Sequence, residues 1–179
     1  LKLCAGLFFK SSALVADGIN NATDVISSVC VLIGLKISRK PADEDHLYGH
    51  FRAELISTLI ASFIMLYAGI EVVMYAVKKI ISGTIEQPSI LSAVVAFIAS
   101  VIMLGVYFYN IRLAKKIGSK SLKAAALDNL SDALVSIGTL IGIIATYIGI
   151  PIADSAVAII VGLLIIYTSV SIFKESTHV

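Results

Sequence analysis

Five long apolar runs, separated by short stretches that hold most of the charged residues, dominate this chain. They cover residues 11–35, 55–77, 87–111, 124–153 and 155–173, and each carries at most two charged residues. A helix of about 20 apolar residues crosses the hydrocarbon core of a bilayer. Because 58% of the residues are hydrophobic and only 15% are charged, the composition also lies outside the range of soluble domains. The sequence therefore predicts an all-α integral membrane protein in a lipid bilayer.

The apolar opening segment, residues 1–9, is too short to cross a bilayer as a helix. We interpret it as the end of a truncated first helix, so that the intact protein would have six spans. The expected helices are approximately 1–9 (partial), 12–36, 53–78, 88–112, 122–148 and 153–174, within a single transmembrane domain, 1–179.

Two acids lie inside one of the apolar runs. Asp128 and Asp132 are four residues apart and therefore share one helix face. Carboxylates inside a membrane are costly, and two of them on adjacent turns repel unless a cation or a proton lies between them. A metal ion meets this need. Acids that are solvated near a helix end, or paired with a lysine of a neighbouring helix, remain the alternative on these residues alone.

A polar stripe lies in the second expected helix. Asp17, Asn20 or Asn21, and Asp24 follow one another at the spacing of one helix face. Polar residues of membrane helices also form hydrogen bonds between helices, which is the alternative interpretation. Oxygen-bearing side chains at four positions so close together favour a functional site, because each is costly to bury in lipid.

The loop after this helix contains two of the three histidines among several acids. Asp43, His46 and His50 are spaced so that a short helical turn would bring them together as metal ligands. A solvated acidic loop explains the same residues without any metal.

The distribution of basic residues predicts the orientation in the membrane. Ten lysines and arginines lie in the loops after the second and fourth spans and after the last span, whereas only Lys10, Lys78 and Lys79 lie on the opposite side. By the positive-inside rule, the side with ten basic residues faces the cytoplasm. Both chain ends are therefore expected to be cytoplasmic.

The two acidic stripes are expected at similar depths. At 1.5 Å per residue, Asp24 lies roughly 18 Å from Lys36, and Asp132 lies roughly 13 Å from Lys123. The second and fifth spans run in opposite directions, so antiparallel packing would bring the two pairs together. The resulting cluster, which favours the metal-site interpretation, comprises Asn20, Asp24, Asp128 and Asp132.

Two other classes of protein fit poorly. The net charge is only +2 and the basic residues are confined to a few loops, so we expect no binding to nucleic acid. An intramembrane aspartyl protease needs one aspartate from each of two helices in a GxGD context, which is missing here, and no HExxH motif is present either. We therefore expect that the chain is not an enzyme.

With these residues identified, the whole chain resembles the transmembrane domain of the cation diffusion facilitator family. The resemblance rests on four segments, which are Leu14 to Gly18, the Asn20xxxAsp24 motif, PADEDHLYGHFRAE from Pro41 to Glu54, and the Asp128xxxAsp132 motif. It implies a six-helix transmembrane bundle, a homodimer, and proton-coupled antiport that expels a divalent metal from the cytoplasm. The family also has a cytoplasmic metal-binding domain after the last helix, which is absent from this chain.

The resemblance also implies roles for individual residues. The transport site falls on Asn20, Asp24, Asp128 and Asp132, and a second, less uniform site falls on Asp43, His46 and His50. Asp17 occupies a position that is commonly acidic but is not counted as a ligand, so we expect it to support the ligands. Arg52 matches a basic residue that pairs with an acid near the end of the sixth helix. We expect this partner after residue 179, with Glu175 as the second candidate.

The predicted ligand set indicates which metal is transported. Zinc carriers of this family typically have a histidine among the four ligands, whereas this chain has one amide and three carboxylates. Oxygen ligands suit Mn²⁺, and the pattern resembles the manganese-exporting branch. We expect Mn²⁺ as substrate and protons as counter-substrate, in a prokaryotic cell (inner) membrane. Export of Fe²⁺, Zn²⁺ or Co²⁺, and a membrane module that binds metal without transporting it, are the alternatives.

Overall fold

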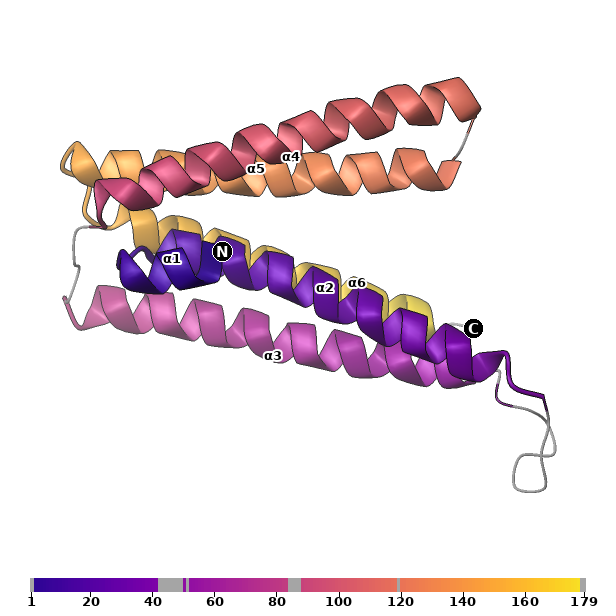
Figure 1. Cartoon of the computed structure of the whole chain (residues 1–179). Coiled ribbons are helices and arrows are strands. Elements are labelled where there is room, and N and C mark those ends of the chain that lie inside the picture. The colour runs from indigo at the N-terminus through magenta and orange to yellow at the C-terminus, as the bar shows by residue number, and fades with distance from the viewer. Residues whose placement is uncertain (1, 42–49, 51, 84–87, 119, 178–179) are drawn as a thin grey trace. The chain divides into compact units, whose positions relative to one another are not determined.

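The computed structural model describes residues 2–41, 50, 52–83, 88–118 and 120–177. These residues contain six α-helices and no strand, which confirms the all-α fold class (Figure 1). The helices are α1 (Lys2–Phe8), α2 (Ser12–Ser38), α3 (Ala53–Ile81), α4 (Ile90–Ile117), α5 (Lys120–Tyr147) and α6 (Ala153–Thr177). Helices α2 to α6 are long and apolar enough to cross a membrane, whereas α1 has only seven residues.

Helix α4 extends five residues beyond its expected end at residue 112. Capping interactions explain where this helix begins and where it ends. At the start, the Ser89 hydroxyl accepts a hydrogen bond from the Leu91 N–H. At the end, Gly118 has φ of 68°, and its N–H donates to the Ala114 carbonyl. Glycine adopts this left-handed conformation without steric cost. Lys115 and Lys116 in the last turn also interact favourably with the negative end of the helix dipole.

The chain divides into two compact units. Unit 1 comprises Leu1–Gly18 and Tyr75–Val161, and unit 2 comprises Ile19–Met74 and Gly162–Val179. Unit 1 therefore contains α1, α4 and α5 together with one end of each of α2, α3 and α6. Unit 2 contains the remaining parts of those three helices.

In unit 1, α4 packs along α5 (Figure 1). Helix α1 contacts α4 in the same unit. A buried cluster of Leu14, Ala96 and Ile143 joins α2, α4 and α5. Helices α5 and α6 approach closely at Gly142, where a Cβ atom would lie 2.7 Å from Cγ2 of Val157. The absence of a side chain at residue 142 therefore permits this contact.

In unit 2, α3 and α6 cross at two glycines. A Cβ atom on Gly69 would lie 3.1 Å from the Gly162 carbonyl oxygen, and one on Gly162 would lie 2.7 Å from Cγ2 of Val73. The two backbones thus approach each other directly, as small residues allow in membrane helices. Farther along the same pair of helices, the rings of Phe63 and Phe173 meet edge to face with centroids 5.5 Å apart.

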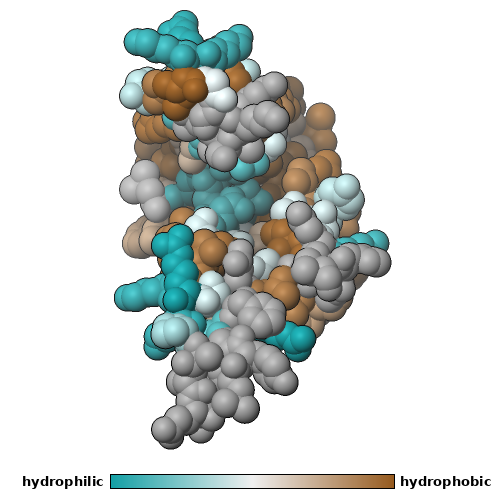
Figure 2. Space-filling view, turned by 90° about the vertical axis from the view of Figure 1, so that its right-hand side faces the viewer, coloured by the Kyte–Doolittle hydropathy of each residue, from teal (hydrophilic) through white to brown (hydrophobic). Residues whose placement is uncertain are grey.

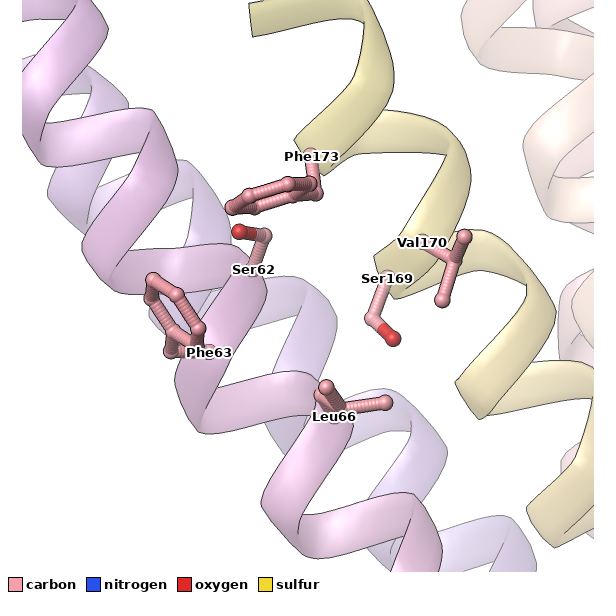
Figure 3. A pocket seen from close by; sticks show the side chains of 6 residues that line it. All are labelled: Ser62, Phe63, Leu66, Ser169, Val170 and Phe173. Atoms are coloured by element: carbon pink, nitrogen blue, oxygen red, sulfur yellow. The ribbon is translucent and has the colours of Figure 1, made fainter. Parts of the chain in front are cut away.

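The two phenylalanines border a small pocket of about 110 Å³ between α3 and α6 (Figure 3). Its other lining residues are Ser62, Leu66, Ser169 and Val170. The serine hydroxyls donate to carbonyls of their own helices, Leu59 at 2.7 Å and Ile166 at 2.7 Å. The lining contains no charged side chain, so the pocket is a gap in the packing and does not resemble an ion site.

Large hydrophobic side chains are exposed on all five long helices, as lipid contact requires. Examples are Leu32 on α2, Tyr67 on α3, Tyr109 on α4, Ile141 on α5 and Tyr167 on α6. Figure 2 looks onto one end of the helices, where hydrophilic residues lie beside hydrophobic ones.

The close contact at Gly142 predicts a difference between two glycines of the same helix. Gly142→Ala should lower the free energy of unfolding by about 1–2 kcal/mol, because the new methyl group overlaps Val157. Gly138→Ala is the matched control, since a Cβ atom there would meet nothing within 4 Å. Unfolding in detergent followed by circular dichroism measures both variants. Equal stabilities of the two variants would contradict the packing of α5 on α6.

Candidate functional site

The first predicted ligand pair lies on α2 in unit 2. Asn20 is half-buried and Asp24, one turn further, is exposed. Both lie within a segment that is long and apolar enough to cross a membrane. The local backbone is regular, since the Thr23 hydroxyl donates to the Asn20 carbonyl at 2.7 Å and the Ser28 hydroxyl donates to the Asp24 carbonyl at 2.8 Å. The helix thus presents the two side chains on one face.

The second predicted pair lies on α5 in unit 1. Asp128 is exposed and Asp132 is half-buried, again one turn apart within a candidate membrane span. The hydroxyl of Ser136, one turn further along α5, donates to the Asp132 carbonyl at 2.9 Å. The structure therefore supports two polar pairs, each on one face of a membrane helix.

Within neither unit do the described residues gather three His, Cys, Asp or Glu side chains at metal-binding distance. The two predicted pairs belong to different units. The four-residue transport site therefore stays a prediction.

The predicted loop site also stays a prediction. Asp43 and His46 lie outside the described residues, and His50 is half-buried just before α3. The His50 carbonyl accepts a hydrogen bond from the Ala53 N–H at 2.9 Å, which begins that helix. Arg52 is exposed, and the side chain of its candidate partner Glu175 is outside the described part of the chain.

Asp17, which we expected to support the ligands, forms a buried ion pair. Its Oδ1 accepts a hydrogen bond from the Lys2 ammonium at 2.9 Å, and the two side chains are 0% and 11% exposed. The same ammonium donates to the Ser136 hydroxyl at 2.8 Å. Helix α1 can approach α2 this closely because Gly18 has no side chain. A Cβ atom at this position would lie only 2.5 Å from the Leu3 nitrogen. One lysine thus connects α1, α2 and α5.

A second buried acid, Asp154 at the start of α6, caps the N-terminus of α2. Its Oδ2 accepts from the Ser12 N–H at 2.6 Å, and its Oδ1 accepts from the Ser11 hydroxyl at 2.6 Å and from the Ala13 N–H at 3.3 Å. A negative charge at a helix N-terminus is favourable because the first N–H groups have no partner within the helix.

Lysine 79 and Thr146 extend this capping network to α3 and α5. The Lys79 ammonium donates to the Ser12 hydroxyl at 2.9 Å and to the Lys10 carbonyl at 3.3 Å. The Asp154 N–H donates to the Thr146 hydroxyl at 3.1 Å. Ends of α2, α3, α5 and α6 are therefore held together at one place in unit 1.

Comparison with known proteins identifies the family. Residues 1–179 match the cation efflux transmembrane domain. The chain belongs to this family. The match confirms the resemblance to the cation diffusion facilitators, and it makes the chain an integral membrane domain of the cation efflux family.

Curated members of the cation efflux family share much of this sequence. The chain is 55% identical to the manganese efflux system protein MneS of Bacillus subtilis over 178 residues, which cover 99% of this chain and 61% of MneS. It is 49% identical to the uncharacterized transporter YdbO of the same organism, again over 99% of the chain and 61% of the relative. It is 38% identical to the magnetosome protein MamB of Magnetospirillum gryphiswaldense, over 97% of the chain and 58% of MamB. The chain thus spans about three fifths of these relatives.

Our sequence reasoning missed the partners of the buried acids. Lys2 is the one charged residue in the apolar segment 1–9, and the need of such a charge for a counter-ion was the available signal. Ser11 and Ser12 are typical residues at a helix start, but nothing in the sequence connects them with Asp154, more than 140 residues away.

The capping network predicts that Asp154 contributes strongly to stability in this cation efflux domain. Asp154→Ala should lower the free energy of unfolding by about 2–3 kcal/mol, because it leaves buried N–H and O–H donors of α2 without an acceptor. Glu71→Ala serves as control, since Glu71 is an exposed acid of α3. Unfolding of the purified proteins in detergent measures the difference. Equal losses in the two variants would contradict the role of the cap.

Proposed function

We propose that this chain is the transmembrane domain of a proton-coupled antiporter that exports a divalent metal, with Mn²⁺ as its main substrate. Membership of the cation efflux family supports metal export and agrees with the expectation that the chain is not an enzyme. The identity of 55% with a protein named as a manganese efflux system supports the choice of Mn²⁺. The proposal rests mainly on two motifs, Asn20 with Asp24 and Asp128 with Asp132. Each motif lies on one face of a membrane helix.

The proposed transport site comprises Asn20, Asp24, Asp128 and Asp132. Within unit 1, the first turns of α2 and the middle of α5 run antiparallel, as this set requires of the two helices. The Thr139 hydroxyl donates to the Ala13 carbonyl at 3.5 Å, and Lys2 bridges Asp17 and Ser136.

The spacing of the sequence supports the pairing of the ligands. Because the second and fifth spans are expected to run in opposite directions, antiparallel packing would bring the Asn20 and Asp24 pair and the Asp128 and Asp132 pair together.

The ligand chemistry favours Mn²⁺. One amide and three carboxylates offer only oxygen atoms, which suit hard ions with higher coordination numbers. Tetrahedral Zn²⁺ sites commonly include nitrogen or sulfur ligands, which this set lacks. Fe²⁺, Zn²⁺ and Co²⁺ are the alternative substrates, and the transport experiment distinguishes them from Mn²⁺.

Proton coupling follows from the charge of the proposed site. Three carboxylates in a membrane interior repel one another unless positive charge compensates them. A divalent ion compensates them in the loaded state, and bound protons do so after the metal has left. Alternating exposure of the site by movements of the helices would then exchange metal for protons across the membrane.

The remaining features of the proposal concern the whole protein. It acts as a homodimer in a prokaryotic cell (inner) membrane, with both chain ends in the cytoplasm. Asp43, His46 and His50 form a second metal site in the loop before α3, and Arg52 pairs with an acid near the end of α6. The excess of basic residues in the loops on one side of the membrane supports this orientation.

Transport by purified full-length protein in liposomes tests the main proposal. Under an imposed pH gradient the parent protein should transport Mn²⁺, and Asp24→Ala or Asp132→Ala should reduce the rate at least about tenfold, because each removes a ligand. Glu71→Ala is the control and should transport like the parent. Metal binding by the parent without any transport would support the alternative of a non-transporting module.

A second variant tests the link between ligand type and metal. Asn20→His adds an imidazole, so it should raise the ratio of Zn²⁺ to Mn²⁺ transport by about tenfold, or about 1.4 kcal/mol. Asn110→His on α4 provides the control, since Asn110 is also half-buried but lies outside the proposed site. The ratio is measured in the same liposomes with each metal alone. An unchanged ratio in Asn20→His would contradict Asn20 as a ligand.

A further inference from the structure

The Lys2 ammonium lies at a junction of three helices. It donates to Oδ1 of Asp17 on α2 at 2.9 Å and to the hydroxyl of Ser136 on α5 at 2.8 Å, while its own backbone belongs to α1. Asp17 is fully buried and the Lys2 side chain is 11% exposed. An ion pair so far from water has a defined geometry, because separating its charges in a medium of low polarity is costly.

Along the sequence, the partners of Lys2 are close to proposed ligands. Asp17 precedes Asn20 by three residues on α2, and Ser136 follows Asp132 by four on α5. Each interval is about one helical turn, or about 4.5–6 Å along the axis. Ser136 is linked to Asp132 directly as well, since its hydroxyl donates to the Asp132 carbonyl at 2.9 Å.

The ion pair also gives one acid of the polar stripe a cationic partner. With an ammonium 2.9 Å from its Oδ1, Asp17 already has a cationic partner, and a divalent ion at the same carboxylate would be repelled by Lys2. The Lys2 ammonium therefore disfavours a divalent ion at Asp17, which agrees with the expectation that Asp17 is not itself a ligand.

We propose that Lys2 is a positioning residue of the metal site. By joining Asp17 to Ser136, it holds the first turns of α2 against α5, one turn away from the proposed ligand Asp132. This inference rests on the proposed transport function. It assigns to α1 a role in metal affinity through the other two helices, without any contact between Lys2 and the metal.

Ser136→Ala tests the proposal with little disturbance of the fold, because it keeps the Lys2–Asp17 ion pair. It removes the hydroxyl that connects Lys2 with α5, together with the bond of that hydroxyl to the Asp132 carbonyl. In liposomes with full-length protein, the KM for Mn²⁺ should rise about tenfold, as is typical when a supporting partner of a metal ligand is lost. The maximal rate should change less than about twofold, because the ligands themselves are intact.

Ser100→Ala is the matched control. Ser100 is a buried serine of α4 in the same unit, and its hydroxyl donates to a carbonyl of its own helix, Phe97, at 2.8 Å. It should leave the KM for Mn²⁺ unchanged. An equal rise in both variants would show a general effect of losing a buried hydroxyl group and would overturn the proposal.

Two changes at the ion pair complete the test. The double variant Lys2→Met with Asp17→Asn removes both charges together, so that no unpaired charge is buried, and it should show the same rise in KM as Ser136→Ala. Lys2→Arg retains a cation and should recover most of the parent affinity. A parent-like KM in both Ser136→Ala and the double variant would refute the positioning role.

Transport by the parent protein distinguishes failure of this inference from failure of the proposed function. If the parent transports no divalent metal, the proposed function fails. If the parent transports Mn²⁺ and Asp132→Ala does not, but the Lys2 and Ser136 variants behave like the parent, only the positioning role fails.

Discussion

Carboxylates within apolar helices are the constraint on which the rest of this structure depends. A charge in such surroundings must have an opposite charge or several hydrogen-bond donors close by. Asp17 satisfies this need through the Lys2 ammonium, and Asp154 satisfies it through the first N–H groups of α2 and the Ser11 hydroxyl. Both sets of interactions connect different helices. The interactions that stabilise the buried carboxylates therefore also hold unit 1 together.

Close packing at glycines complements these polar connections. Gly142 permits contact between α5 and α6 in unit 1, and Gly69 with Gly162 permits contact between α3 and α6 in unit 2. Between apolar helices in lipid there is little hydrophobic driving force, so short approach distances and buried hydrogen bonds carry much of the association. Both units thus use close contacts at glycines, and unit 1 adds the buried ion pair of Lys2 and Asp17.

Much of the architecture could be predicted from the sequence, because bilayer thickness and backbone hydrogen bonding leave an apolar run few conformations other than a helix. The all-α fold and the face shared by each polar pair follow from local spacing alone. The end of α4 was less predictable, since Gly118 and the two lysines before it carry the helix past the apolar run. The loop site of Asp43, His46 and His50 is predicted from residue spacing alone, and Asp43 and His46 lie outside the described residues.

The sequence by itself determined the membrane helices, the family and the residues that offer oxygen ligands, since each of these depends on residue type and local spacing. Only the tertiary structure decided which partners the buried acids take. Lys2 and Asp17 are 15 residues apart, and Ser11 and Asp154 are 143 residues apart. Such pairs form because helix packing brings distant segments together, and no local pattern records which helices will be neighbours.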